Sequence, residues 1–391
     1  MIAENMTSYF FYSLLFIYPF FPLIKEKINT IGNAAELLLI VALFLGSIFY
    51  GKGKKIGAGL AKSVTPLLFF TIVYLILGSS DYYDSFSAFR VYLLYISVTQ
   101  LFLIRSDIID YKKVITILML TCIVMSLGAV LQFINPSIIT NLHTTESLSQ
   151  LRFKSDFKAF SVYNRAISFM LDPNILSIFL CFNMMAIIQF FKSRDKNFFF
   201  IFTIVLSLIG CALSQSRTGL IVIITYLLFQ FFQWIVTTHK VRTIGFFVFF
   251  VAICVCAFWL LTNFQFILQF LRVDTLLSAN GRTVNSQNMW RDLNEQNIVH
   301  FLFGNGLTTG RNIIFENSYL LCFYSFGLIG SIAFLICFFA LIIPLINRNN
   351  WIPIICFAIV NIVGDYLLIP QVTLYALLCL GIPAADERSM N

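Results

Sequence analysis

The chain has 391 residues, of which 59% are hydrophobic and only 11% are charged, and its mean hydropathy is +0.87. Soluble domains carry about 25% charged residues, so this chain cannot cover itself with polar surface and is predicted to be a polytopic membrane protein. Its formal net charge of +8 therefore concerns which side of a membrane each charge occupies, and no nucleic-acid partner is expected.

Apolar segments near the 20 residues that a membrane-spanning helix needs recur along the chain. We predict an all-α protein with a single transmembrane domain over 1–391. Two long, more polar segments interrupt it, at 135–172 and 264–316, and we expect them to carry amphipathic helices on the membrane surface. The predicted spans number about twelve: 9–24, 35–50, 65–80, 87–104, 113–134, 173–191, 198–215, 217–236, 243–263, 317–346, 351–368 and 370–382.

The orientation follows from the lysines and arginines in the short connections, because cytoplasmic loops carry an excess of these residues. With the N-terminus in the cytoplasm, the inner connections hold basic clusters at 52–62, 105–113 and 192–196. Both termini are therefore predicted to be cytoplasmic, and both long segments are predicted to lie on the outer face.

The segment "NRAISFMLDPNIL", at 164–176, follows the first long loop. Asp172 is predicted to cap a helix that begins at Pro173, since aspartate favours the cap position and proline the first helical position. Asn174 follows in the same turn. Arg165 would then lie at the membrane surface beside the cap.

The segment "SQSRTG", at 214–219, places Arg217 in a connection of about three residues between two apolar spans. One interpretation is a guanidinium that anchors a helix end at the interface. The other is anion binding, because a guanidinium pairs bidentately with phosphate and the neighbouring hydroxyls are donors. Arg217 would also open the next helix, whose N-terminus attracts anions.

The segment "FENSYLLCFYSFGLIGSIAFL", at 315–335, places polar residues at the outer end of a span. Asn317 or Ser318 is predicted to cap this helix, with Tyr319 in its first turn. The Glu316 carboxylate could instead act as a base toward a hydroxyl. Glycines 327 and 330 are interpreted as packing residues, because small residues let membrane helices approach closely.

Other charged residues lie in or near the outer face. Asp365 is an acid within or at the edge of an apolar hairpin, where such a residue needs a partner, either structural or functional. Arg152, Arg282 and Arg311 lie in the two long segments.

Cofactor and metal motifs are not found in the sequence. The nine cysteines form no CxxC pair and are interpreted as small buried hydrophobic residues. No nucleotide-binding or metal-binding pattern occurs, so neither a cofactor nor a metal is predicted.

The ordered motifs resemble the O-antigen polymerase and O-antigen ligase superfamily (Wzy and WaaL types). In the ligases the residue before Asn in the "HNxYL" pattern is usually His, whereas Glu316 stands here, which favours a polymerase. The motifs that carry the resemblance are "R…DPN" at 165–174, "SQSRTG" at 214–219, "GR…W" at 281–290, "FGNG" at 303–306 and "ENSYL…FGLIG" at 316–330.

The resemblance implies a metal-independent, inverting glycosyltransferase embedded in the cell inner membrane, with a GT-C-like fold and a site facing the periplasm. Its donor and acceptor would be oligosaccharides linked to undecaprenyl diphosphate within the membrane lipid. A chain-length regulator and a flippase are candidate partners. Glu316, Arg217 and Arg282 are the expected catalytic residues, and the expected substrate-binding residues are Arg165, Arg311, Arg152, Asn317, Tyr319, Asp365, Asp172 and Asn174.

Two other classes remain open. A ligase-like glycan transferase shares the same motifs, and a lipid-linked oligosaccharide flippase or other transporter fits the same number of spans. Transporters usually show internal repeats and midplane sites. Here no repeat is evident, and the polar residues gather at one face.

Overall fold

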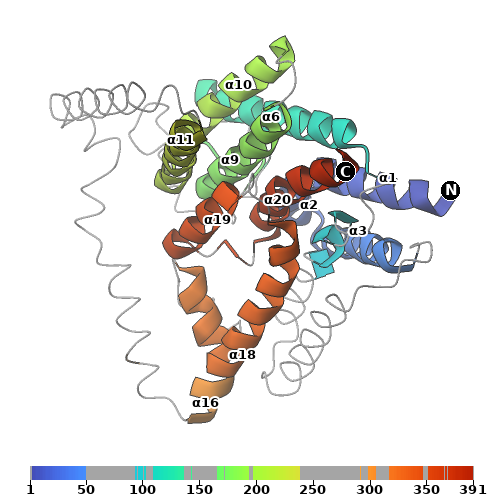
Figure 1. The fold of residues 1–391 in the computed structure, drawn as a ribbon, viewed down its shortest axis with the longest axis vertical. Coiled ribbons are helices and arrows are strands. Elements are labelled where there is room, and N and C mark those ends of the chain that lie inside the picture. Colours follow the sequence, from blue (N-terminus) through green and yellow to red (C-terminus); the bar gives the residue numbers. More distant parts are fainter. Residues whose placement is uncertain are drawn as a thin grey trace.

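The fold is helical throughout the part of the chain that the structure, a computed structural model, describes (Figure 1). This confirms the all-α class for those residues. The structure describes residues 2–49, 93–94, 96–99, 101–102, 109–135, 142, 165–170, 172–192, 197–237, 291, 298–304, 317–346, 351–364, 366–367 and 369–390.

Four of the described helices are long and apolar enough to cross a membrane, judged by length and composition. Five shorter apolar helices accompany them. The expected spans at 65–80 and 243–263 lie outside the described residues, and 87–104 is described only in part. The four long helices are Met6–Lys27, Tyr111–Ile134, Pro173–Phe190 and Ser318–Ile336.

The N-terminal part is a helical hairpin. Helix α1 (Ile2–Ile17) continues through a 3-10 turn into α2 (Phe21–Lys27), and α3 (Asn29–Phe49) runs back along it. The Lys25 ammonium pairs with the Glu36 carboxylate, which is fully buried. This pair neutralises the charge of Lys25, which lies beside the turn between α2 and α3. The distribution of basic residues predicts that this turn lies on the outer face.

A central group of helices contains α6 (Tyr111–Ile134), α9 (Pro173–Phe190), α10 (Phe198–Ser214) and α11 (Arg217–Thr237). Helix α9 packs against each of the other three and is the most enclosed of the four long helices, with 78% of its span buried. A helix that is apolar on every side can be covered in this way without burying charge. Helix α9 can therefore serve as the core that positions the helices around it.

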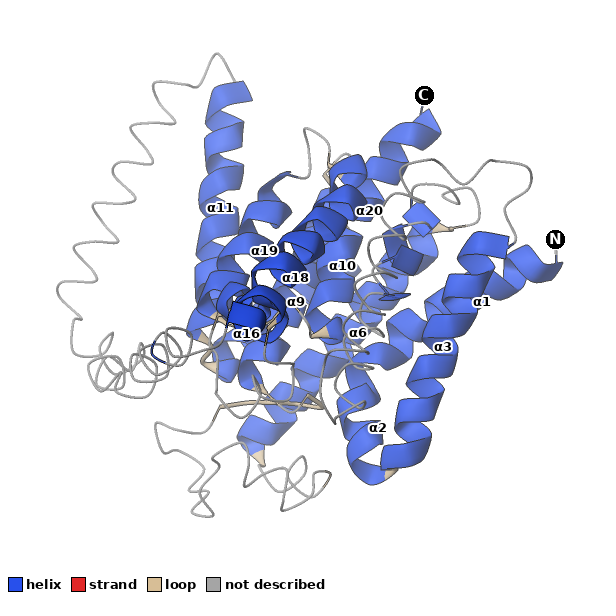
Figure 2. Cartoon of the chain, turned by 90° about the horizontal axis from the view of Figure 1, so that it is seen from below, coloured by secondary structure: helices blue, strands red, loops and turns tan. Residues whose placement is uncertain are grey.

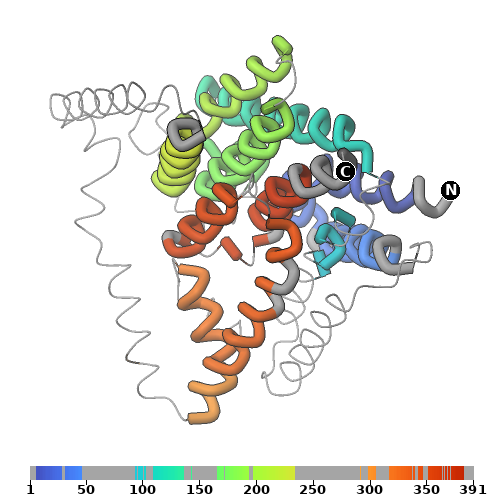
Figure 3. Tube along the Cα trace, in the orientation of Figure 1, coloured from blue at the N-terminus to red at the C-terminus, as the bar shows by residue number. Residues whose placement is uncertain are grey.

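Helix α20 (Pro370–Met390) joins this group from the end of the chain and lies beside α9 (Figure 3). The rings of Phe179 and Tyr375 meet edge to face, with centroids 4.5 Å apart. The Tyr375 hydroxyl donates a 2.8 Å hydrogen bond to the carbonyl oxygen of Leu15 in α1. The C-terminal helix thus links the N-terminal hairpin to the core.

Helix α18 (Ser318–Ile342) is broken at Gly327, where φ is +65° and ψ is −173°. Its two arms diverge from a vertex beside the short helix α16 (Ile298–Phe303) (Figure 1). The sequence predicted one continuous span over 317–346, and the structure instead shows two helical arms. The expectation that Gly327 is a packing residue is confirmed, because a Cβ there would lie 2.4 Å from the Gly304 nitrogen.

The ends of the helices are ordered along one direction. In Figure 2 the first turn of α1, the last turn of α20 and the C-terminal end of α11 lie toward one end of the bundle, and α2 lies toward the other. The N-terminal ends of α9 and α18 begin with side-chain caps from Asp172 and Asn317. The cap at Asp172 was predicted from the sequence, and of the two candidates Asn317 and Ser318 the structure shows Asn317 as the cap of α18.

Candidate functional site

The connection between α10 and α11 consists of Gln215 and Ser216. Gln215 adopts the left-handed conformation, with φ of 48° and ψ of 37°, which turns the chain sharply. The Ser216 hydroxyl oxygen accepts a 3.2 Å hydrogen bond from the Gly219 amide, and the Ser216 carbonyl accepts one from the Leu220 amide. Ser216 therefore caps α11, and Arg217 is the first residue of that helix, as the sequence predicted.

Arg165 lies against this connection. Its Nε donates a 3.0 Å hydrogen bond to the Ser214 carbonyl oxygen, and its Nη2 donates a 2.6 Å hydrogen bond to Oδ1 of Asn174. The same Oδ1 accepts a 3.0 Å hydrogen bond from the Ser216 hydroxyl. We call these three side chains the Arg165–Asn174–Ser216 network. It joins the "R…DPN" and "SQSRTG" motifs.

The start of α9 contributes a negative charge to the same place. The Asp172 carboxylate accepts hydrogen bonds from the amides of Asn174 and Ile175, at 2.6 and 3.1 Å. Arg165 and Arg217 contribute two guanidinium groups to this connection beside the Asp172 carboxylate. Because Asn174 and Ser216 are hydrogen-bonded, the N-terminal ends of α9 and α11 also lie together. Both features favour an anionic ligand.

Helix α6 holds the loop that carries Arg165 through hydrogen bonds to its backbone. Gln132 is buried, and its side-chain oxygen accepts hydrogen bonds from the Ile167 and Ser168 amides at 2.8 and 3.0 Å. A Cβ on Gly128 would lie 2.3 Å from the Ser168 hydroxyl oxygen, so glycine permits the close approach. Sequence reasoning missed Gln132. The signal available was a polar residue in the last turn of an apolar span.

Helices α9 and α11 pack closely next to the Arg165–Asn174–Ser216 network. A Cβ on Gly219 would lie 1.6 Å from the Ser177 hydroxyl oxygen, so α11 crosses α9 at a glycine. The thiol sulfurs of Cys181 and Cys211 are 3.9 Å apart just below this crossing. Six described cysteines are buried and form no disulfide, which confirms for them the prediction that the cysteines are small buried hydrophobic residues. They are Cys122, Cys181, Cys211, Cys322, Cys356 and Cys379.

A second polar network surrounds the start of α18. Asn317 accepts hydrogen bonds from the Tyr319 and Leu320 amides, so its side-chain oxygen is used by the helix start. The Ser318 hydroxyl lies 2.8 Å from both Asn361 Oδ1 and the Gly364 carbonyl oxygen, either of which can accept its proton.

The connection between α19 (Trp351–Val363) and α20 docks on this helix start. The Ser318 amide donates a 3.1 Å hydrogen bond to the Gly364 carbonyl oxygen, and the Leu367 amide donates to the Ser318 hydroxyl at 3.2 Å. Sequence reasoning singled out neither Asn361 nor the role of Ser318 in this contact. The "ENSYL" motif is thus tied to the segment "GDYL".

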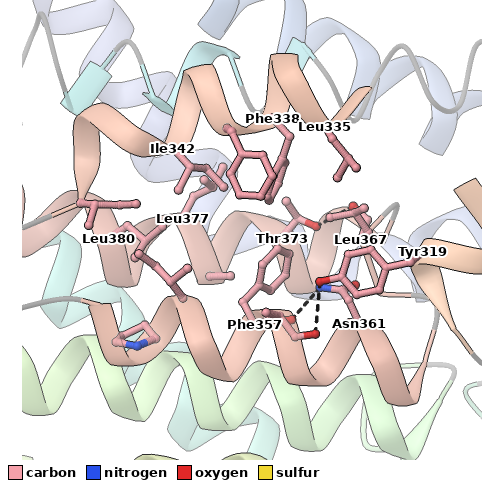
Figure 4. Close-up of a pocket in the computed structure, with 16 residues that line it drawn as sticks. Tyr319, Leu335, Phe338, Ile342, Phe357, Asn361, Leu367, Thr373, Leu377 and Leu380 are labelled. Carbon is pink, nitrogen blue, oxygen red and sulfur yellow. Dashed lines mark hydrogen bonds between the residues drawn. The ribbon is translucent and has the colours of Figure 1, made fainter. Parts of the chain in front are cut away.

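Tyr319 is turned toward a cavity. Its hydroxyl donates a 3.3 Å hydrogen bond to the Ala358 carbonyl oxygen of α19, and its ring lines a pocket shared with Asn361 and Thr373 (Figure 4). The remaining candidates, Glu316, Arg152, Arg282, Arg311 and Asp365, lie outside the described residues.

Neither a scan against protein-family models nor a search of the curated proteins found a match for this chain. The support for a function therefore comes from the motifs of the sequence and from the two polar networks. Among the described residues, no group of three or more His, Cys, Asp and Glu side chains is placed to hold a metal ion.

Proposed function

We propose that this protein is a membrane-embedded polysaccharide polymerase that joins oligosaccharide repeat units linked to undecaprenyl diphosphate. The observation that carries the proposal is the Arg165–Asn174–Ser216 network. It gathers two motifs that resemble those of the polymerase and ligase superfamily around the first residue of α11, Arg217. Two arginines at two adjacent helix starts suit a diphosphate.

In the proposed reaction the acceptor is the terminal sugar hydroxyl of one lipid-linked unit. Its oxygen attacks the anomeric carbon of the donor chain from the side opposite the diphosphate, and the bond from that carbon to the diphosphate oxygen breaks. The configuration at the anomeric carbon is therefore inverted. The leaving diphosphate gains negative charge, and the acceptor hydroxyl loses its proton.

Arg217 and Arg282 neutralise the developing charge in this proposal, with Arg165 and Arg311 in support. A preorganised donor at such a position is worth about 3–4 kcal/mol of transition-state stabilisation by analogy with oxyanion sites. Glu316 takes the proton of the acceptor. Arg152, Asp172, Asn174, Asn317, Tyr319 and Asp365 position substrate or arginine side chains, and for Asp172, Asn174 and Asn317 the hydrogen bonds above favour positioning.

The proposal includes a location and a topology. The protein would lie in the cell inner membrane with about twelve spans in a GT-C-like arrangement, and with both termini in the cytoplasm. The site would face the periplasm. The direction of α11 supports this topology, because its N-terminal end with Arg217 lies opposite the end where α1 begins and α20 stops (Figure 2).

The exchange of Arg217 for lysine tests the role of the guanidinium. Arg217→Lys keeps the charge but removes the planar pair of donors. In a purified assay with lipid-linked repeat units, we expect polymer formation to fall at least tenfold. Full-length polymer at the wild-type rate would show that bidentate diphosphate binding by Arg217 is wrong.

The exchange of Glu316 for glutamine tests the proton acceptor. Glu316→Gln retains the size of the side chain and removes its basicity, so we expect loss of polymer with retained binding of the lipid-linked donor. Wild-type polymerisation by this variant would eliminate Glu316 as the base.

A deletion of the gene separates the function classes. Loss of a polymerase leaves surface glycan with a single repeat unit, whereas loss of a ligase or of a flippase leaves none. A surface with no glycan at all would overturn the polymerase proposal.

A further inference from the structure

A cavity lies between the second arm of α18, α19 and α20 (Figure 4). It encloses about 80 Å³. Sixteen residues line it, and all but three carry purely hydrocarbon side chains. The three exceptions are Tyr319, Asn361 and Thr373.

The polar side chains of the lining already form hydrogen bonds to other groups of the protein. In Figure 4, Tyr319 and Asn361 lie at one end of the cavity and Leu380 lies at the other. The Asn361 amide donates to the Phe357 carbonyl oxygen at 2.8 Å, and the Thr373 hydroxyl donates to the Leu367 carbonyl oxygen at 3.1 Å. The interior therefore offers hydrocarbon rather than hydrogen bonds, which disfavours a polar ligand and ordered water.

The lining also reaches the surface of the protein. Phe339 and Ile346 line the cavity, and 49% and 41% of their surfaces are exposed. Ile343, between them, is 60% exposed. A surface of this composition faces hydrocarbon in a membrane protein, so a chain that enters the cavity can continue along α18 into the bilayer.

The polar end of the cavity adjoins the candidate site. Asn361 is hydrogen-bonded to Ser318, which follows Asn317 at the start of α18, and Tyr319 is the next residue. A lipid with its chain in the cavity and its head group at this end would present that head group to the "ENSYL" motif. This continuity distinguishes a substrate lipid from a lipid that merely fills a gap.

We propose that this cavity holds a short segment of the isoprenoid chain of the lipid-linked substrate, close to its diphosphate. The inference rests on the proposed function for the identity of the lipid. A dry apolar cavity of roughly 150 Å³ accommodates one benzene ring, so the cavity here, about half that volume, holds part of one isoprene unit. The rest of the chain lies along Phe339, Ile343 and Ile346.

The test is photo-crosslinking to the purified protein in phospholipid nanodiscs. The probe is a polyprenyl phosphate with a diazirine in its first isoprene units, and a diazirine phosphatidylethanolamine is the second arm. We expect the polyprenyl probe to label peptides of α19 and α20 that line the cavity, and unlabelled polyprenyl phosphate to compete. Labelling by the phospholipid probe alone, or labelling confined to other helices, overturns the proposal.

Filling the cavity provides the matched variants. Ala376→Phe adds a ring at a buried lining position of α20, and Leu335→Trp adds volume at a less buried lining position of α18. We expect each to reduce labelling of the lining peptides at least fivefold. Ala212→Phe, at an exposed position of α10 outside the cavity, should label like the wild type. Wild-type labelling of both filled variants overturns the proposal.

A comparison of anchors separates this inference from the proposed function. With repeat units on long isoprenoid chains, Ala376→Phe should raise KM at least fivefold, and with anchors too short to reach the cavity it should not. If the wild type transfers no sugar to any acceptor, the polymerase proposal fails, and crosslinking still decides whether an isoprenoid occupies the cavity. Glu316→Gln should keep the wild-type labelling.

Discussion

At the scale of single residues, Asn174 connects the two motifs of the candidate site. Its Oδ1 accepts hydrogen bonds from the Arg165 guanidinium and from the Ser216 hydroxyl, which caps α11. One amide oxygen thus fixes the direction of Arg165 and the start of the helix that carries Arg217. The residue is a positioning residue in the proposed reaction, because these contacts are to protein groups.

Removal of this amide should destabilise the protein. Asn174→Ala removes the acceptor of the hydrogen bond from Nη2 of the partly buried Arg165, and a hydrogen bond to a charged group contributes about 1.5–3 kcal/mol. We expect a lower midpoint of thermal unfolding in detergent. Asn183→Ala is the matched control on the same helix, since the buried Asn183 amide has no hydrogen-bond partner in the structure. An equal loss in both variants would contradict the role assigned to Asn174.

Asn174→Asp separates position from charge. The variant keeps an acceptor oxygen for Arg165 and Ser216, so its thermal midpoint should stay within the range of the wild type. The new carboxylate adds a negative charge beside Arg165, so the affinity for a lipid diphosphate should fall about tenfold or more. Binding of polyprenyl diphosphate measured at low and high salt checks this expectation. Unchanged affinity would argue that the anion binds elsewhere.

At the scale of elements, the break in α18 depends on two glycines. Gly304 and Gly327 both have positive φ, at 86° and 65°. A Cβ on Gly304 would lie 2.2 Å from the Ser325 carbonyl oxygen, so the backbones of α16 and α18 touch directly. The Phe301 and Phe323 rings, 5.8 Å apart and edge to face, pack beside this contact. The "FGNG" and "FGLIG" motifs therefore meet for packing.

A side chain at the break should disrupt this contact. Gly327→Ala forces a residue with a Cβ into a positive-φ, extended-ψ conformation that is essentially confined to glycine, which costs about 1–3 kcal/mol. The atoms that the Cβ meets are backbone atoms, which cannot rotate away. We expect a clear drop in the thermal midpoint. Gly210→Ala, within α10, meets mainly side-chain atoms of Leu180 and Ser126 and should cost less. Equal effects of the two variants would show that the break is not the sensitive feature.

At the scale of the whole molecule, the ends of several described helices are arranged toward two opposite ends of the bundle (Figure 2). The turn between α2 and α3 lies at one end, and the C-terminal ends of α11 and α20 lie at the other (Figure 2). The buried Glu36 carboxylate neutralises the charge of Lys25 near the α2 end. This arrangement agrees with the direction that the basic connections indicate.

Reporter fusions test this orientation. A phosphatase that is active only in the periplasm should be active when fused at Ile28, between α2 and α3, and inactive after Thr237 or after Met390. A fluorescent protein that folds only in the cytoplasm should show the reverse pattern. Activity at both ends of α11 would contradict a spanning helix, and the opposite pattern throughout would invert the proposed topology.

Local chemistry made much of this protein predictable. Apolar segments of about 20 residues indicate helices without any knowledge of their neighbours, and the described helices occupy most of the expected spans. The caps at Asp172 and Asn317 were predictable because a cap acts within three residues of its own helix. The same holds for Arg217 at the start of α11, since Ser216 and Gly219 are its neighbours in the chain.

The sequence by itself thus determined the helical class of the described residues, the presence of helices long and apolar enough to cross a membrane, and the local starts of the helices. Only the tertiary structure decided which motifs meet. Arg165 reaches Ser214 across 49 residues, and Ser318 reaches Gly364 across 46. Hydropathy is a property of one segment and contains no information on its partner. Contacts such as Gln132 with the Arg165 loop, the glycine break in α18 and the cavity beside α20 arise from close packing of distant segments, which single-segment patterns do not encode.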